Sequence, residues 1–228
     1  FGDYQHRYLI DQAVKDGATV PIYYEMRDAQ LQIDGRDLER DIRATFPELS
    51  NEEIEKLKRG MRLQEKLAGA QVRVEAIAKD ILGHYRSTIE PNGFKAQIVT
   101  VSRDVAVTYV EALRQLGAPE CALIMSASNN DSARLQAHHL SKRERDTMIG
   151  RFRKRDDPLK ILVVCDMLLT GFDAPVEQVL YLDAPLREQT LLQAIARVNR
   201  TADGKALALI HISAPTRQRR TTYAVFCL

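Results

Sequence analysis

The sequence predicts an α/β fold in which a mainly parallel sheet is flanked by helices. Short apolar runs rich in β-branched residues alternate with longer segments of helical period in the second half of the chain. The run Ile161–Cys165 is continuously apolar, which is typical of a strand covered on both faces. Strands that alternate with helices need right-handed crossovers, which favour parallel pairing. The expected strands are Gln97–Val101, Ala122–Met125, Ile161–Cys165, Val179–Leu182 and Ala206–Ile210, and the expected helices are Arg103–Leu116, Lys142–Phe152 and Thr190–Asn199.

Four regions are expected along the 228 residues. Residues 1–33 are interpreted as a linker and a first strand that come from a preceding domain. Residues 34–90 are interpreted as a helical insertion, in which Ser50 and Glu53 form a capping box. Residues 91–212 have the alternation of a RecA-like domain, and residues 213–228 form an irregular tail that we interpret as truncated or non-native.

Composition and motifs argue against general binding to polyanions, against a metal site and against a membrane partner. A net charge of +2 gives no general attraction to polyanions, so any contact with nucleic acid must be local. The three cysteines have no metal-binding or redox spacing, and the five histidines form no HExxH motif, so we expect no metal site in this chain. The sequence has neither a signal peptide nor a long apolar run, which predicts a cytoplasmic protein without a membrane partner.

The turn that follows Ile161–Cys165 is the first candidate for ligand binding. Ligands of open α/β sheets bind at the carboxyl ends of strands, and a glycine there allows close approach of the backbone to a phosphate. We therefore expect Thr170 and Gly171 to contact a phosphate chain and Asp173 to accept a hydrogen bond from a ribose hydroxyl. The alternative is an ordinary turn with a solvated aspartate.

The helix expected from Thr190 carries two arginines one turn apart. Gln193, Arg197 and Arg200 share one face, while Leu192, Ile195 and Val198 face inward; Thr190 caps the helix, with Gln193 completing a capping box. Two guanidinium groups on one face repel each other unless an anion or carboxylates lie opposite them. A transferring phosphoryl group is such an anion, because the guanidinium fork matches its oxygens. The alternative is a salt-bridged surface helix.

These segments resemble motifs of superfamily 2 helicases and translocases. DMLLTGFDAP (166–175) resembles motif V, LLQAIARVNR (191–200) resembles motif VI and KAQIVTVSR (95–103) resembles motif IV. Together they are most similar to the motor (restriction) subunit of type I restriction-modification enzymes, and FGDYQHRYLIDQAVKDGATVPIYYE (1–25) is similar to the stretch that leaves its first motor domain. Ala196 supports this choice, because many superfamily members have glycine there whereas the restriction subunits commonly have alanine.

The resemblance implies the second motor domain of an ATP-dependent endonuclease subunit that translocates double-stranded DNA. ATP and Mg²⁺ would be bound mainly by a preceding motor domain. The catalytic residues would be Arg197, Arg200 and Gln193, and Gly171, Asp173 and both arginines would contact the cofactor. Ser102, Arg103, Thr170 and Gly171 would contact DNA. Ser102 and Arg103 also stand where a strand ends and a helix begins, which favours an anion, although Ser102 can simply cap that helix. The implied partners are the first RecA-like domain and the methyltransferase and specificity subunits.

Three motifs of a complete enzyme of this kind are missing from the sequence. There is no GxxxxGK[ST] phosphate loop, no DEAD or DEAH carboxylate pair and no Glu-x-Lys nuclease motif. We therefore expect the chain alone to be inactive as an ATPase or nuclease. Two alternatives stay open: the C-terminal domain of another superfamily 2 helicase or remodeller, and a non-catalytic interaction domain with the same fold.

Overall fold

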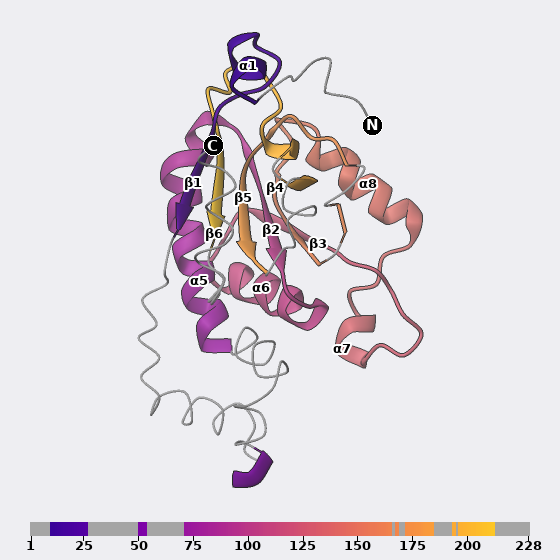
Figure 1. Ribbon diagram of the computed structural model, residues 1–228. Helices are drawn as coiled ribbons and strands as arrows, with labels where there is room; N and C mark the ends of the chain where they lie inside the picture. Colours follow the sequence, from indigo (N-terminus) through magenta and orange to yellow (C-terminus); the bar gives the residue numbers. More distant parts are fainter. Residues whose placement is uncertain are drawn as a thin grey trace, which may run out of the picture.

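The computed structural model describes residues 10–26, 50–53, 71–165, 167–168, 172–184, 193–194 and 196–212. Within them, six strands form one parallel sheet with the order β1-β6-β5-β2-β4-β3 (Figure 1). This arrangement confirms the predicted fold class, a mainly parallel sheet flanked by helices. The strands are β1 (Ile22–Met26), β2 (Lys95–Thr100), β3 (Glu120–Ile124), β4 (Leu159–Val164), β5 (Glu177–Asp183) and β6 (Ala208–Ile212).

Helix starts follow local capping. Ser141 and Glu144 form a reciprocal capping box at the start of α8, and Ser102 accepts a hydrogen bond from the backbone N–H of Val105 at the start of α6. The expected capping box between Ser50 and Glu53 is also present. None of the described helices is long and apolar enough to cross a membrane. The helices are α1 (Ile10–Lys15), α5 (Gln71–His84), α6 (Arg103–Gln115), α7 (Ala133–Gln136) and α8 (Lys142–Phe152), and α5 continues into a π-helical turn (Tyr85–Ile89) and a 3-10 turn (Glu90–Asn92).

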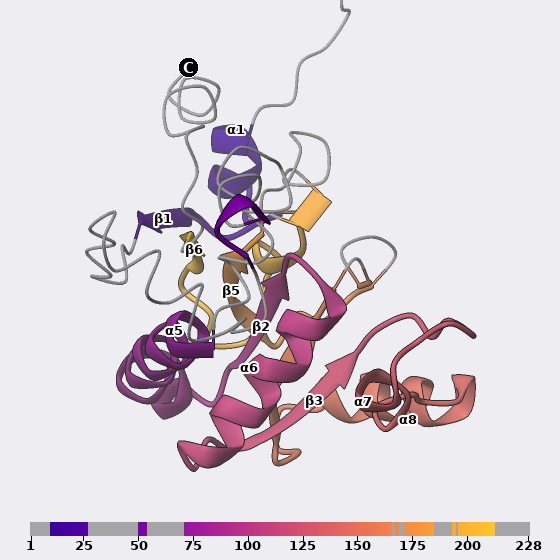
Figure 2. The same cartoon turned by 90° about the horizontal axis from the view of Figure 1, so that it is seen from below.

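Both faces of the sheet are buried. On one face, Ile98 and Ile161 pack with residues of α5 and α6, which lie side by side in Figures 1 and 2. On the other face, their sequence neighbours Val99 and Leu162 pack with Phe152 of α8 and with residues 194 and 198. Because side chains alternate along a strand, a strand with two buried faces must be apolar throughout. This explains why Ile161–Cys165 is a continuous apolar run.

The structure departs from the expected regions near the N-terminus. We assigned residues 1–33 to the exit from a preceding domain, but β1 pairs with β6 in the sheet, with Ile22 opposite Ala208. We assigned residues 34–90 to an insertion, but Val74, Ile77 and Ile81 of α5 belong to the same core as the sheet. β1 is far from β6 in sequence, and α5 is far from several strands of the core that it joins. Local sequence patterns therefore do not reveal these contacts. Residues 1–9, 27–49, 54–70 and 213–228 lie outside the described residues.

Candidate functional site

The candidate residues lie at the two opposite ends of the parallel strands. We call the end where the strands begin the amino-terminal edge of the sheet and the end where they finish the carboxyl edge. Asp173 shortly precedes β5, and Arg200 forms an antiparallel bridge with Thr19 just before β1, so both lie at the amino-terminal edge. Ser102 follows the last residue of β2 and therefore lies at the carboxyl edge. The general rule for α/β sheets had led us to expect Asp173 at the carboxyl edge as well. It lies at the opposite edge because the segment after β4 must return to the edge where β5 begins.

Asp173 and Arg200 form an ion pair. The Arg200 Nη1 lies 3.1 Å from the Asp173 Oδ2, and about half of each side chain is exposed, at 50% and 49%. The backbone around Arg200 is fixed, since the N–H of Val20 donates to the carbonyl of Asn199 at 2.8 Å. A half-exposed pair contributes at most about 1 kcal/mol to stability. The Arg200 guanidinium is therefore placed by its backbone while its ionic partner can be exchanged at low cost.

The arginine-bearing segment has the orientation expected from its sequence wherever it is described. Ala194 and Val198 are buried and join the core on the α8 face, whereas Gln193 is exposed. Arg197 is partly buried. Thr190, Leu192 and Ile195, which we expected to cap the helix or face inward, lie outside the described residues.

Arg197 lies in a positive environment that two acids moderate. Burial lowers the pKa of its guanidinium, and the positive charge of Arg200 lowers it further, while Glu177 and Asp173 act in the opposite direction. These four residues therefore share one electrostatic site at the amino-terminal edge of the sheet. Such a site would gain from an anion that binds between the two guanidinium groups.

Glu177 was not identified from the sequence. It is the first residue of β5, its side chain is buried, and neither carboxylate oxygen has a hydrogen-bond partner among the described residues. Burial raises the pKa of Glu177 to about 8, against the opposing positive charges of Lys205 and Arg197. No local pattern marks this glutamate, because it simply precedes an apolar run.

Lys205 shares the burial of Glu177. Its Nζ donates to the main-chain carbonyl of Pro175 at 3.1 Å and to that of Glu177 at 2.5 Å. Burial lowers the pKa of Lys205 to about 8, although the charge of Glu177 opposes this shift. The two carbonyls replace the water that the ammonium group loses, and they hold the start of β5 against the loop before β6.

We expect Glu177→Gln to remove a pH dependence of stability. In the unfolded chain the Glu177 carboxyl ionises near 4.5, whereas in the folded chain its pKa is about 8. Between these values the folded state keeps a proton that the unfolded state has lost, so stability falls as the pH rises. Each pH unit in this window costs about 1.4 kcal/mol, or about 2 to 3 kcal/mol between pH 5 and pH 7.

The measurement is the free energy of unfolding in urea at several pH values from 5 to 7. The Glu177→Gln variant should become progressively more stable than the parent as the pH rises. The exposed residue Asp146 supplies a control, since Asp146→Asn should leave the slope unchanged. Parallel profiles for the parent and Glu177→Gln would show that Glu177 is ionised in the folded protein.

At the carboxyl edge, Ser102 and Arg103 have structural partners. Ser102 caps α6, as the structural alternative predicted. The Arg103 Nη2 lies 2.6 Å from the Asp131 Oδ1, and its Nη1 donates to the Ser126 carbonyl at 3.0 Å. Asp131 also contacts His139 at 2.8 Å. Arg103 thus holds the loop after β3 in place. Thr170 and Gly171, the other candidates for this edge, lie outside the described residues.

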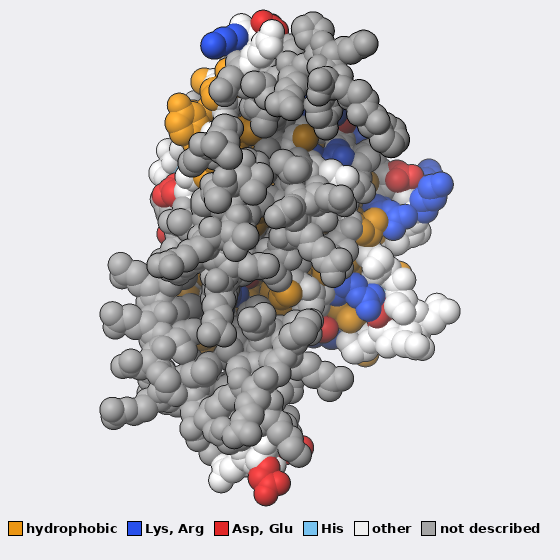
Figure 3. Space-filling view, in the orientation of Figure 1, with side chains coloured by type: hydrophobic (Ala, Val, Ile, Leu, Met, Phe, Trp, Pro, Cys, Tyr) orange, Lys and Arg blue, Asp and Glu red, His pale blue; other side chains and the backbone are white. Residues whose placement is uncertain are grey.

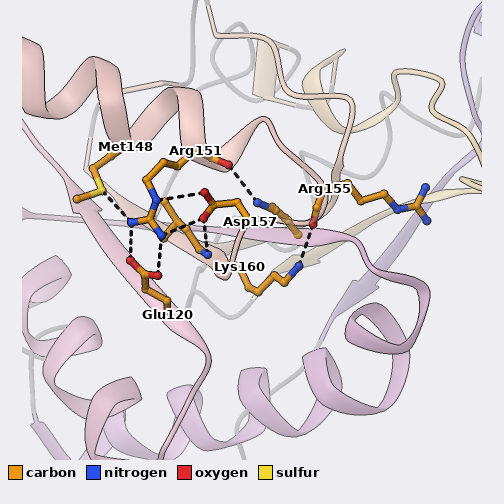
Figure 4. A network of polar contacts seen from close by, with 8 residues as sticks. Glu120, Met148, Arg151, Arg155, Asp157 and Lys160 are labelled. Atoms are coloured by element: carbon orange, nitrogen blue, oxygen red, sulfur yellow. Dashed lines mark hydrogen bonds and ion pairs between the residues drawn. The ribbon is translucent and has the colours of Figure 1, made fainter.

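The basic stretch at residues 151–155 has partners within the protein. The Arg151 guanidinium contacts Glu120 at 2.6 Å and Asp157 at 2.9 Å (Figure 4). The hydrogen bonds that it donates to Glu120 and, second, to Asp157 raise its pKa. The Arg155 guanidinium lies 4.4 Å from the centre of the Phe94 ring and donates to the carbonyl of Asp203. Acidic and basic side chains also adjoin over α8 in Figure 3. Part of the positive charge of this stretch is therefore cancelled within the protein.

Two family models match parts of the sequence. The model for domain 3 of the type I restriction enzyme subunit R matches residues 138–210, and the SWI2/SNF2 ATPase model matches residues 1–55. The first match contains Asp173, Arg197, Arg200 and Glu177, and therefore the whole site at the amino-terminal edge.

Full-length relatives agree with these matches. The endonuclease subunit of the type I restriction enzyme HindI from Haemophilus influenzae is 38% identical over 217 residues, which is 90% of this chain and 20% of that protein. The MjaIXP endonuclease subunit from Methanocaldococcus jannaschii is 34% identical over 214 residues, which is 92% of this chain and 20% of that protein. The chain thus spans about a fifth of the length of the curated relatives that it matches.

A solved structure shares the fold. The fragment structure assigned to an HsdR subunit of a type I restriction enzyme from Vibrio vulnificus YJ016 aligns with a TM-score of 0.59 at 15% identity, over 91% of this chain and 34% of that one. The chain thus shares the α/β fold of that fragment. Within this fold class, the chain belongs among the homologues of the R (endonuclease) subunits of type I restriction enzymes.

Proposed function

We propose that this chain is the second motor domain of an ATP-dependent DNA-translocating endonuclease subunit. The homology to endonuclease subunits supports this proposal. The main structural observation in its favour is the arrangement of Arg197 and Arg200 beside Asp173. In the proposal, a preceding RecA-like domain binds most of ATP and Mg²⁺. The present chain closes the nucleotide site with its amino-terminal edge, and the exposed Gln193 is proposed to contribute to it.

Arg197 and Arg200 act as arginine fingers in this proposal. Charge spreads over the phosphoryl oxygens as the bond to the leaving group breaks, and a planar fork of donors stabilises that charge. The ion pair with Asp173 keeps Arg200 oriented until the nucleotide arrives. Because the pair is half exposed, a phosphate can replace the carboxylate, which then becomes available to a ribose hydroxyl.

Double-stranded DNA is assigned to the opposite edge. The N-terminus of α6 would contact phosphates there through N–H donors, and we propose Thr170 and Gly171 as further DNA contacts. Strands of six residues separate the two edges by about 20 Å. A rigid sheet packed on both faces would carry a displacement at the nucleotide edge to the DNA edge. Arg103 acts there by supporting the loop that Asp131 belongs to.

The remaining parts of the proposal concern the complete enzyme. The neighbouring motor domain of the same subunit would supply the phosphate loop, and a separate region would supply the nuclease. Methyltransferase and specificity subunits are the proposed protein partners, because the relatives are subunits of restriction enzymes. The chain alone is then expected to show negligible ATP hydrolysis.

The proposal is tested by Asp173→Ala in a subunit that contains both motor domains. We expect the KM for ATP to rise by about ten- to a hundredfold, which corresponds to the loss of a charge-assisted hydrogen bond of about 1.5 to 3 kcal/mol. DNA affinity should stay within about twofold of the parent, because the assigned DNA residues lie at the other edge of the sheet. Nucleotide affinity and DNA affinity are measured separately, by titration.

Asp146→Ala on α8 is the matched control, since it removes an exposed carboxylate away from the site. Its KM for ATP should equal that of the parent. If Asp173→Ala left the KM for ATP unchanged, or lowered DNA affinity instead, the assignment of the amino-terminal edge to the nucleotide would be wrong.

A further inference from the structure

Three side chains with metal-binding atoms converge beside the edge strand β1. They are Glu25 of β1, His211 of β6 and His84 at the end of α5, and one ligand atom from each lies within 4.8 Å of the others. The His211 Nε2 and the Glu25 Oε2 are 2.9 Å apart. Both histidines are buried, at 7% and 1% exposure, while 45% of the Glu25 side chain is exposed. The cluster is therefore enclosed by protein on the histidine side and reached from solvent on the glutamate side.

The sheet register creates this cluster. Glu25, His211 and Tyr181 lie opposite one another across β1, β6 and β5, so their side chains project from the same face. The last residue of α5 brings His84 over that row, with its ring centre 4.1 Å from that of His211 and the ring planes tilted by 43°. Residues from four elements thus meet at one point, although they are far apart in sequence.

Tyr181 fixes the orientation of one imidazole. Its hydroxyl lies 2.7 Å from the His84 Nδ1, and its ring meets that of His211 edge to face, with centres 5.1 Å apart. Histidines that bind metals usually have a hydrogen-bond partner of this kind, which sets the tautomer and the direction of the ring. The cluster thus has ligand side chains together with a residue that orients one of them.

We propose that Glu25, His84 and His211 bind one Zn²⁺ ion, with water in the fourth position. Two imidazoles and one carboxylate are an established ligand set for zinc, whereas Mg²⁺ and Ca²⁺ prefer oxygen ligands. Zinc–ligand distances of about 2.0 to 2.2 Å require the three ligand atoms to come within about 3.3 Å of one another. The Glu25 and His211 atoms already lie within this limit, at 2.9 Å, so the movement required is that of His84 relative to these two side chains. The ion replaces the direct contact between Glu25 and His211, and any proton held by either imidazole leaves for solvent.

The site would have a structural role. It joins α5 to the row formed by β1 and β6, and it adds a side-chain link to the backbone pairing of these two strands. The ion would therefore stabilise the attachment of the N-terminal strand to the domain. This site lies on the face covered by α5, and it uses none of the residues that we assign to the nucleotide or to DNA.

The test uses the purified chain after removal of metals with a chelator. We expect isothermal titration with Zn²⁺ to give one site with a Kd of about 1 μM or lower, and elemental analysis after dialysis to give one zinc per chain. Zinc should raise the Tm, because an ion that binds only the folded state stabilises it. The absence of saturable binding, together with an unchanged Tm, would overturn the proposal.

Variants separate this site from adventitious binding. Glu25→Gln changes a half-exposed residue and should preserve the fold while it weakens zinc binding by at least about tenfold, and His84→Gln should have a larger effect. Tyr181→Phe removes only the orienting hydroxyl and should weaken binding by about ten- to a hundredfold. His138→Gln is the control, because His138 lies outside the cluster. If His138→Gln weakened binding as much as Glu25→Gln did, or if Glu25→Gln and His84→Gln left the Kd unchanged, the three residues would not be the ligands.

Discussion

Replacement of Arg200 or Arg197 by alanine in the intact subunit is expected to lower ATP turnover by about 10³- to 10⁵-fold, the range reported for arginine fingers. Each substitution removes a fork of donors from an edge where two guanidinium groups, the Asp173 carboxylate and the Glu177 carboxyl group share one electrostatic site. Assembly of the complex on DNA should persist, because this edge is not the one assigned to DNA. The measurement is steady-state ATP hydrolysis at saturating DNA, with DNA affinity measured in parallel.

The structure allows the catalytic effect to be separated from an effect on folding. Arg200 is half exposed, so the loss of its ion pair with Asp173 should change the free energy of unfolding by no more than about 1 kcal/mol. Arg200→Lys keeps the positive charge but loses the planar fork, and we expect it to recover only part of the turnover. Arg143→Ala, an exposed substitution on α8, is the matched control and should keep full activity.

A salt-bridged surface helix was the alternative interpretation of these arginines, and Asp173 does supply the carboxylate that it requires. The two interpretations differ in what the substitution changes. If the pair is only structural, Arg200→Ala should lower stability slightly and leave ATP turnover near that of the parent. Near-normal turnover for both Arg197→Ala and Arg200→Ala would therefore favour a non-catalytic interaction domain.

Local physical signals explain why much of the fold could be predicted from the sequence. The expected helix Lys142–Phe152 has the observed bounds because Ser141 and Glu144 cap it. The expected strand Ile161–Cys165 overlaps β4 because both of its faces are buried. The outward direction of Gln193 and the burial of Val198 follow from helical period alone. Each of these features is encoded within a few residues of where it appears.

The remaining features depend on contacts that are distant in sequence. The pairing of β1 with β6 and the packing of α5 on the sheet join segments that no short pattern connects. The edge at which Asp173 lies depends on the path of the chain after β4. Glu177 could not have been found at all, since its altered pKa comes from burial by other elements. The geometry of the candidate site was therefore only partly accessible to sequence analysis.

A buried ionic network at the carboxyl edge has the same non-local origin. Arg73 of α5 forms a two-pronged ion pair with Asp183 at the end of β5, with one contact of 2.9 Å from its Nη1, and the Tyr109 hydroxyl of α6 donates to the same carboxylate at 2.8 Å. The side chains of Arg73 and Asp183 are 7% and 1% exposed. Burial opposes the charge on Arg73, but the hydrogen bonds and charge of Asp183 raise its pKa overall. The network thus joins both helices of one face to the central part of the sheet.

Asp183→Ala is expected to lower the free energy of unfolding by about 3 to 5 kcal/mol, because it leaves the Arg73 charge buried without its partner. Tyr109→Phe should cost only about 1 kcal/mol, since it removes one hydrogen bond and preserves the ion pair. The decisive comparison is the combined variant Arg73→Met, Tyr109→Phe, Asp183→Leu, measured by urea denaturation beside the single variants. Because no charge then remains buried, it should regain most of the stability lost in Asp183→Ala. If the combined variant were as unstable as Asp183→Ala, lost packing rather than an unpaired charge would explain the effect, and the ionic network would not be what attaches α5 to the sheet.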